Sequence, residues 1–336
     1  MMSRKPTMED VKNLAGVSIS TVSRVINNSK PVSPDKRKAV EQAIEKLGYK
    51  RNELARSLVL KQSQTIGIIL DDLEVEYMAQ YVRGIDEIGK AYNFDLLLYS
   101  TFGDMETQKE AVEFLFSKQV EGIIVIAEHI NSEILYTIKE YDIPYVLLDK
   151  YYNPDDFKTV TFEYKEAMQK MTEYYIENNH KKLLYLTKRG HDYSLEQKQA
   201  GFEKALESKG LTKQIFSVDT NTPEAAYRFM NDNVSYIHKQ GITGVVAATD
   251  QLATGVLHYC YDHGINVPED LSVSGFGNLG FTSLLRPSLT TVSMTYYDVG
   301  AIAIRLLIKE LREDLPFKES VKLGYEIMLR ETVKHL

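Results

Sequence analysis

Residues 19–27 carry side chains that suit contacts with nucleic acid. Val22, Val25 and Ile26 are spaced to form the buried face of one helix. The opposite face consists mostly of hydroxyl, amide and guanidinium groups, which suit phosphates and base edges better than a protein core. This outward set is Ile19, Ser20, Thr21, Ser23, Arg24 and Asn27. The pattern predicts a helix that enters the major groove of DNA.

A preceding helix is expected to position this one. Thr7 is a suitable N-cap, and Asp10 follows three residues later, where a capping box has an acidic or amide side chain. The apolar face of this first helix is expected to be Val11, Leu14 and Ala15. Gly16 supplies the positive φ of a tight turn, and Ser18 can cap the second helix. The two helices and their turn are typical of a helix-turn-helix. A purely structural helical hairpin is the alternative.

A third helix is predicted to complete this small domain. Ser33 is a cap, Pro34 occupies the first helical position and Gly48 ends the helix. Val40, Ile44 and Leu47 fall on one face of it. Residues 1–50 are therefore predicted to form an all-α DNA-binding domain.

The motif T-x-x-D-V-x-x-x-A-G-V-S-x-x-T-V-S-R-V-I-N, from Thr7 to Asn27, resembles that of the LacI/GalR family of bacterial transcription regulators. The likeness extends along essentially all 336 residues. It implies a homodimer that binds an inverted-repeat operator in double-stranded DNA. Thr7, Ser18 and Ser33 are expected to join the outward helix face in contacting DNA.

The resemblance also implies a hinge helix and linker at residues 51–63, ordered when two protomers bind an operator. The residues that resemble the family's hinge pattern are Asn52, Ala55, Arg56 and Leu58. Leu58 falls where the family inserts a leucine into the minor groove and bends the DNA. The alternative is that Leu58 only covers the core domain. Arg51 stands where the family commonly has proline.

Charge is divided unevenly along the chain. Residues 1–63 carry thirteen Lys or Arg against six Asp or Glu, a net charge of +7, so the remainder carries −14 to give the total of −7. A basic segment joined to an acidic body is expected when one part meets phosphate. The first residues lack the apolar stretch of an export signal, and no run is long enough to span a membrane. We therefore expect a cytoplasmic protein.

From residue 65 onward, short apolar strands alternate with amphipathic helices, which is typical of parallel α/β folds. The expected strands are 65–70, 94–100, 121–127, 144–149, 181–187, 214–219, 243–249, 271–276 and 289–294. The resemblance implies a periplasmic-binding-protein-like core of two doubly wound parallel-sheet subdomains. The core is expected over residues 64–336, with one subdomain at 64–161 and 293–323. The other comprises 162–292 and 324–336, and the chain crosses near 161, 292 and 324.

Three residues are candidates for binding an effector between the subdomains. Asp149 ends a predicted strand, Asp250 lies in a motif that resembles the family's S/T/N-D-x-x-A, and Lys198 stands where the family usually has arginine. Lysine keeps the charge of arginine but loses its planar pair of donors. A turn residue at 149 and a helix cap at 250 are the alternatives. Two family motifs, D-N-x-x-G and G-F/Y-D-[DN], are replaced here by residues 163–167 and 275–278.

The sequence offers no signature of catalysis. The seven histidines lack metal-ligand spacing, and no phosphate-binding loop or nucleophile elbow is present. His180 is expected to be a capping or packing residue, and the single Cys260 to pack in a core. We expect neither an enzyme nor a resident cofactor or metal.

Two regulatory hypotheses differ in what the core binds. In the first, a repressor of carbohydrate-utilisation genes responds to a small sugar or sugar phosphate in the cleft. In the second, the chain is a catabolite-control-type regulator activated by the serine-phosphorylated phosphocarrier protein HPr. The basis is residues 297–307, where Tyr297 and Arg305 would contact the partner. A sugar-binding protein without regulatory role would have no use for residues 1–63.

Overall fold

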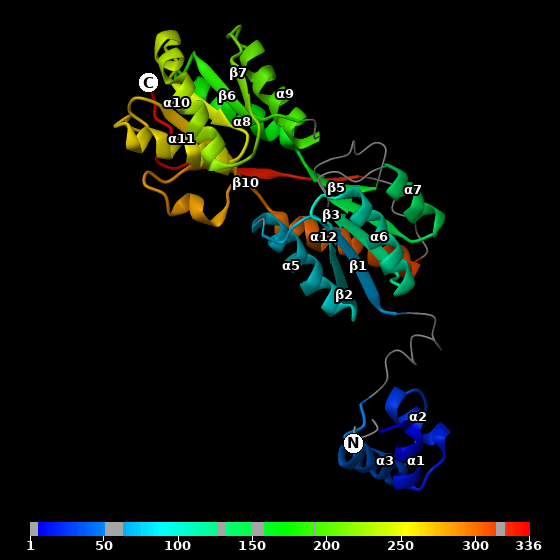
Figure 1. Ribbon diagram of the computed structural model, residues 1–336. Helices are drawn as coiled ribbons and strands as arrows, with labels where there is room; N and C mark the ends of the chain where they lie inside the picture. The colour runs from blue at the N-terminus through cyan, green and yellow to red at the C-terminus, as the bar shows by residue number, and fades with distance from the viewer. Residues whose placement is uncertain are drawn as a thin grey trace. The chain divides into compact units, whose positions relative to one another are not determined.

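The computed structural model describes residues 6–50, 63–74, 76–126, 132–148, 158–190, 193–313 and 320–336. The chain forms two compact units, Met1–Ser63 and Gln64–Leu336 (Figure 1). Each unit has its own core.

The first unit is helical throughout its described residues. Its helices there are α1 (Met8–Ala15), α2 (Ile19–Asn27) and α3 (Pro34–Leu47). Its buried core is Val11, Val22, Val25, Val40 and Ala43. The prediction that Leu14 belongs to this core was wrong, because its side chain is 45% exposed. Val11 and Ala15 are four residues apart, so they share the inward stripe of α1, and Leu14 falls beside it.

The second unit contains two sheets, each of six strands among the described residues. The first has the order β11-β5-β4-β3-β1-β2 and the second β12-β10-β9-β8-β6-β7. The first sheet comprises β1 (Thr65–Leu70), β2 (Asp95–Ser100), β3 (Gly122–Ile126), β4 (Tyr145–Leu148), β5 (Thr159–Phe162) and β11 (Val321–Leu323). The second comprises β6 (Leu183–Lys188), β7 (Ile215–Val218), β8 (Gly244–Ala247), β9 (Ser272–Gly277), β10 (Thr290–Met294) and β12 (Tyr325–Met328). We call the halves built on them the N-subdomain and the C-subdomain.

Pairing is parallel except that β12 runs antiparallel to β10. The predicted class, a helical DNA-binding domain followed by two parallel α/β subdomains, is confirmed. The short strands β5, β11 and β12 were not predicted. β5 is buried, but its four residues alternate threonine with apolar side chains, while β11 and β12 are half exposed and neither forms a continuous apolar run.

Helices cover both faces of each sheet. In the N-subdomain, α5 (Glu76–Ala91) and α12 (Tyr296–Glu313) cover one face, while α6 (Met105–Ser117) and α7 (Ser132–Glu140) cover the other. In the C-subdomain, α8 (Tyr164–Glu177) and α9 (Tyr193–Glu207) lie opposite α10 (Pro223–Gln240) and α11 (Asp250–Asp262). A short 3₁₀ helix, η1 (Gly280–Ser283), follows β9. Because both faces are buried, the inner strands β1, β3, β4 and β8 are almost wholly apolar, whereas β5, β9 and β10 also bury serine or threonine.

Glycines allow paired helices to pack backbone to backbone. A Cβ on Gly84 of α5 would lie 2.1 Å from the carbonyl oxygen of Tyr297 on α12. A Cβ on Gly201 of α9 would lie 2.2 Å from the carbonyl oxygen of Lys165 on α8. Only hydrogen fits at these positions. In each subdomain, a glycine therefore allows two helices to pack closely against each other.

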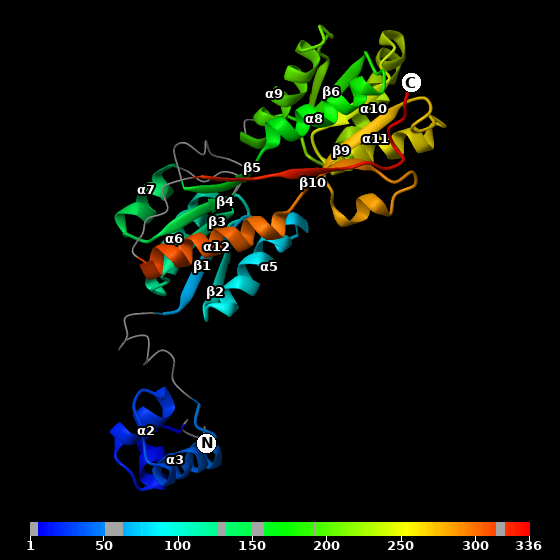
Figure 2. The ribbon, with the colours of Figure 1, turned by 180° about the vertical axis from the view of Figure 1, so that it is seen from behind.

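The chain passes between the subdomains at three points. It crosses at Glu163 between β5 and α8, at Thr295 between β10 and α12, and at Gly324 between β11 and β12. Figure 2 shows the red C-terminal segment, which carries β11 and β12, running from one subdomain to the other. The backbone N–H of Glu163 donates to the carbonyl of Leu323 at 3.1 Å, which ties the first crossing to the third.

Candidate DNA-binding helix and effector site

Caps define both ends of α1 and the start of α2. The Thr7 hydroxyl accepts from the N–H of Asp10, and the Asp10 carboxylate accepts from the N–H of Thr7 at 2.8 Å, so the predicted capping box is present. Gly16 ends α1 with φ 66°, a left-handed conformation that favours glycine. Ser18 then caps α2 by accepting from the N–H of Thr21 at 3.2 Å.

The outer face of α2 presents polar groups to solvent. Val22 and Val25 are buried beneath it, as predicted. Exposed on this unit are Thr7, Ser18, Ile19, Ser20, Arg24, Asn27 and Ser33, while Thr21 and Ser23 are half-buried. Ser33 begins α3 without a side-chain capping bond.

Arg24 is the cation of this face. Among the described residues, no hydrogen bond or ion pair engages its guanidinium. Asn27, one turn later, donates to the Ser23 hydroxyl at 3.1 Å. An exposed, unpaired guanidinium is the group that binds guanine or phosphate most effectively.

The second candidate site lies where strands of the C-subdomain end. Asp250 is the first residue of α11, which begins shortly after β8 ends at Ala247 and is capped by Thr249, and it is fully buried. Its carboxylate accepts from the Leu279 N–H at 2.8 Å and from the Thr291 hydroxyl at 2.5 Å. Burial raises the pKa of Asp250 to about 6, although these two hydrogen bonds oppose the increase.

Lys198 is close enough to Asp250 for its positive charge to lower the pKa of the carboxylate, against the effect of burial. It is buried on α9 and donates to the carbonyl of Ala248 at 3.2 Å. Its ammonium lies 4.3 Å from the ring centre of Phe276 and 5.3 Å from that of Tyr164. Aromatic faces attract a desolvated cation, so the lysine is held by two rings and a carbonyl.

Comparisons with known proteins identify the family. Residues 7–52 match the model of bacterial regulatory proteins, lacI family, and residues 172–333 match a periplasmic binding protein-like domain. Catabolite control protein A of Priestia megaterium is 30% identical over 98% of this chain and 99% of its own. The chain belongs to the LacI family. The HTH-type transcriptional regulator RegA of Clostridium saccharobutylicum is 32% identical over 97% of this chain and 98% of its own.

A solved structure shows the same fold. The lac repressor dimer bound to operator and the anti-inducer ONPF matches with a TM-score of 0.86 at 23% identity, covering 98% of this chain and 100% of that one. The family match and the curated relatives make this LacI-family chain a DNA-binding transcriptional regulator. The exposed face of α2 is its candidate base-reading surface.

Several predicted residues lie outside the described part of the chain. They are the hinge candidates Asn52, Ala55, Arg56 and Leu58, and the effector candidate Asp149. Of the three effector candidates, Lys198 and Asp250 are brought together. Asp250 follows the carboxyl end of β8, and the Lys198 ammonium reaches the same place from α9 by donating to the Ala248 carbonyl. Ligands of α/β folds bind at the carboxyl ends of strands.

The site also contains groups that the sequence analysis missed. Arg330 donates to the side-chain oxygens of Asn278 at 2.6 Å and Thr282 at 3.0 Å, and to the carbonyl of Leu289. It also lowers the pKa of Asp250. Arg330 follows the antiparallel strand β12, so its proximity depends on a pairing that was not predicted.

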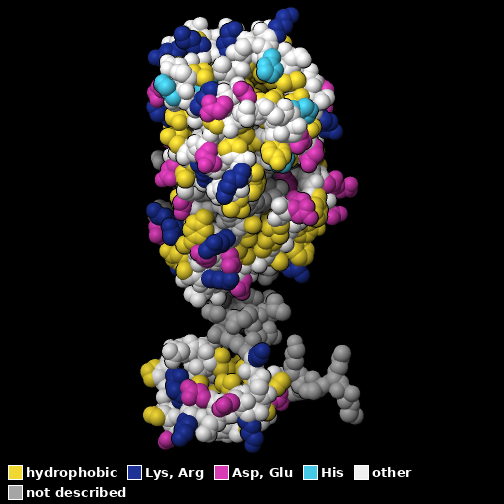
Figure 3. Space-filling model, turned by 90° about the vertical axis from the view of Figure 1, so that its left-hand side faces the viewer, with side chains coloured by type: hydrophobic (Ala, Val, Ile, Leu, Met, Phe, Trp, Pro, Cys, Tyr) yellow, Lys and Arg dark blue, Asp and Glu magenta, His cyan; other side chains and the backbone are white. Residues whose placement is uncertain are grey.

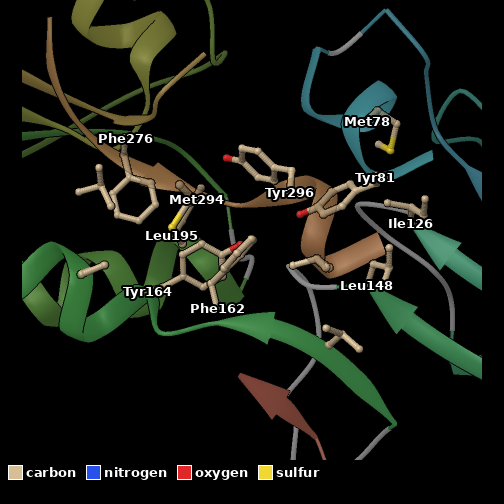
Figure 4. Close-up of a cluster of buried hydrophobic side chains, with 14 of the residues drawn as sticks. Met78, Tyr81, Ile126, Leu148, Phe162, Tyr164, Leu195, Phe276, Met294 and Tyr296 are labelled. Atoms are coloured by element: carbon tan, nitrogen blue, oxygen red, sulfur yellow. The ribbon is translucent and has the colours of Figure 1, made fainter. Parts of the chain in front are cut away.

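Rings fill the region between the subdomains. Figure 4 shows Tyr81, Phe162, Tyr164, Phe276 and Tyr296 as neighbours in one buried cluster. They come from five elements, α5, β5, α8, β9 and α12, and only Phe162 and Tyr164 are close together in sequence. Phe162 lies beside a predicted crossing, whereas nothing local in the sequence marked Tyr81 or Phe276.

The predicted partner-contact residues lie on α12. The Tyr297 hydroxyl donates to Glu87 of α5 at 2.8 Å, and this bond raises the pKa of Tyr297. Arg83 donates to the same carboxylate at 2.9 Å, and its guanidinium lies 5.9 Å from the Tyr297 ring centre. Arg305 is exposed, and its positive charge lowers the pKa of the Tyr297 hydroxyl, against the increase caused by Glu87.

His180 is a packing residue, as predicted. Its ring nitrogens lie 2.8 Å from the Thr243 hydroxyl and 3.0 Å from the carbonyl of Lys334, and burial lowers its pKa. Within the described ranges, no three His, Cys, Asp or Glu residues are grouped to hold a metal ion. No helix in the same ranges has the length and apolar character to cross a membrane.

Proposed function

We propose that this regulator represses carbohydrate-utilisation genes and is activated by a phosphorylated protein partner, as a catabolite-control-type regulator responding to serine-phosphorylated HPr. The carrying observation is the surface formed by Arg83, Tyr297 and Arg305 on the paired helices α5 and α12. Among the described residues, no hydrogen bond or ion pair occupies the Arg305 guanidinium. Similarity to catabolite control protein A over nearly the whole chain supports the proposal.

The geometry of this surface suits a phosphoserine. The Arg83 guanidinium lies 5.9 Å from the Tyr297 ring centre, and the charges of both Arg83 and Arg305 lower the pKa of the Tyr297 hydroxyl, against the increase caused by Glu87. Glu87 orients Arg83 and Tyr297 through separate carboxylate oxygens. A phosphate of nearly two negative charges would bind Arg305 through charge-assisted hydrogen bonds, with Arg83 beside it.

The test is operator binding followed by fluorescence anisotropy at fixed salt. Serine-phosphorylated HPr should raise operator affinity, while unphosphorylated HPr should not. Arg305→Ala should abolish the response but leave basal operator affinity unchanged, because the helix-turn-helix is untouched. Arg228→Ala, an exposed arginine on α10, is the matched control. An equal response in wild type and Arg305→Ala would reject the proposal.

A sugar or sugar phosphate in the core is the second candidate function. Lys198 and Asp250 favour it, because a cation and a carboxylate lie together at the strand ends. The undescribed Asp149 is the third proposed contact. In the same assay, a panel of sugars and sugar phosphates should then change operator affinity, and Lys198→Met should remove that change. A response to sugars without any response to phosphorylated HPr would favour this candidate.

We propose that the regulator acts as a cytoplasmic homodimer without catalytic activity. One helix-turn-helix covers one half-site, so an inverted-repeat operator needs two protomers. Apolar side chains are exposed on the N-subdomain at the edge strand β2 and after it: Leu98, Phe102 and Met105. Figure 3 shows hydrophobic side chains gathered between charged ones on one face of the second unit. Sedimentation of the wild-type chain and of the Phe102→Ser variant tests whether two protomers associate through this surface.

A further inference from the structure

We propose that a continuous row of aromatic rings latches the two subdomains of the core together without a ligand. The rings belong to one buried cluster that contains residues of both subdomains. This inference concerns the cleft and the crossings, so it does not depend on which partner binds α12.

The rings form an unbroken series from one subdomain to the other. In the C-subdomain, Phe276 of β9 lies 6.0 Å from Tyr164, and Tyr164 lies 5.8 Å from Phe162 across the first crossing. Phe162 lies 5.7 Å from Tyr296, with its ring plane at 86°. Edge-to-face contacts at these separations are attractive beyond the apolar area they bury.

The series continues into the N-subdomain through α5. Tyr296 stacks on Tyr77 at 5.4 Å and meets Tyr81 edge to face at 5.3 Å. Its hydroxyl also faces the C-subdomain, because a Cβ on Gly277 would lie 3.5 Å from it. Tyr296 therefore contacts both subdomains (Figure 4).

Every crossing is flanked by members of this cluster. Phe162 and Tyr164 enclose the first crossing, Met294 and Tyr296 the second, and Leu323 and Tyr325 the third. A rotation of one subdomain on the other would change the backbone angles at these points. It would also separate rings that are buried, so the packing opposes the rotation.

Lys198 anchors the C-subdomain end of the row. Its ammonium lies over both Phe276 and Tyr164, and its donation to the Ala248 carbonyl fixes it to the end of β8. Asp250 supports the same end by holding the turn after β9 through the Leu279 N–H. The two candidate effector residues thus position the latch.

The distance between the subdomains tests the latch directly. Spin labels at Ala79→Cys on α5 and Lys204→Cys on α9, both exposed positions, report it in the full chain. The buried Cys260 is replaced by alanine, and excess unlabelled protein ensures one labelled protomer per dimer. Double electron–electron resonance of the ligand-free protein should give a single narrow distance distribution.

Tyr296→Leu should populate a second distance, with the ratio of open to closed forms raised about tenfold, equivalent to about 1.4 kcal/mol. Tyr164→Asn should act in the same direction. Tyr259→Leu is the matched control, because Tyr259 stacks on His263 at 3.9 Å within the C-subdomain alone. The control should keep the wild-type distribution.

Lys198→Met is the milder variant if Tyr296→Leu unfolds, because methionine removes the positive charge over the rings and keeps a side chain of similar length. It should also populate the second distance. Unchanged distributions in every folded variant would overturn the latch, as would a wild type already divided between two distances. A wild-type protein that does not bind an operator would instead contradict the regulatory function. The operator-binding assay and the distance measurement therefore distinguish failure of the function from failure of the latch.

Discussion

The buried carboxylate of Asp250 makes a pH-dependent prediction for Asp250→Asn. Burial raises the pKa of Asp250 from its ordinary value of 3.8 to about 6 in the folded protein. Ionisation is therefore harder in the folded than in the unfolded chain. Stability from this group is greatest below about pH 4, where both states are protonated, and falls as the pH rises through about 6.

The magnitude follows from the two pKa values. Each pKa unit corresponds to about 1.4 kcal/mol, so the full penalty above pH 6 is about 3 kcal/mol. About 2 kcal/mol of it develops between about pH 4.5 and 7.5. Asparagine cannot ionise, so the variant lacks this slope, although losing an acceptor for Thr291 or Leu279 adds a pH-independent offset. The difference in unfolding free energy, variant minus wild type, should rise by about 2 kcal/mol across this range.

Urea unfolding followed by near-ultraviolet circular dichroism is the assay. The chain has 22 tyrosines and no tryptophan, and only Tyr49 lies in the first unit, so the signal reports the core. Titrations of other groups cancel in the difference between the two proteins. Thr254→Val, a neutral change one turn along α11, controls for local packing and should give a flat difference. A flat difference for Asp250→Asn as well would refute the reasoning.

Two further predictions concern the DNA-binding helix and helix packing. Arg24→Ala should lower operator affinity by about 1–3 kcal/mol and relax base specificity. Lys38→Ala on α3 should instead reduce affinity for all DNA sequences alike. Equal anisotropy titrations for wild type and Arg24→Ala at one salt concentration would contradict the role of Arg24. Gly201→Ala should destabilise the core by about 1–3 kcal/mol in urea unfolding, because its Cβ would meet the Lys165 carbonyl at 2.2 Å. Gly324→Ala, with no atom within 4 Å of its Cβ, should change stability by less than about 0.5 kcal/mol, and equal losses in both would argue against a packing cause.

Features that depend on local chemistry were predictable from the sequence. The capping box of Thr7 and Asp10, the left-handed Gly16 and the Ser18 cap all involve atoms within a few residues of one another. The parallel fold class was predictable because strands buried on both faces leave continuous apolar runs. Leu14 was assigned wrongly because a helical stripe fixes neighbouring residues only approximately, and the facing helix decides which one is covered.

Features that depend on long-range register could not be predicted. Asp250 was identified from a motif that resembles the family's S/T/N-D-x-x-A, but its partners Leu279 and Thr291 lie 29 and 41 residues away. The sequence therefore indicated a carboxylate at the site without showing that the chain itself supplies two donors to it. Arg330 was missed for the same reason, because its contacts need β12 to pair with β10.

The departure at Gly277 from the family pattern explains why Asp250 can be satisfied internally. Gly277 has φ 135°, and a Cβ there would lie 3.1 Å from the Asp250 carboxylate. The family motif has aspartate at this position, and a second carboxylate so close would oppose the ionisation of the first. With glycine, the backbone can turn tightly enough for the Leu279 N–H to reach Asp250. The departure from the family motif thus lets the chain itself satisfy Asp250, which holds the turn after β9 at one end of the proposed ring row.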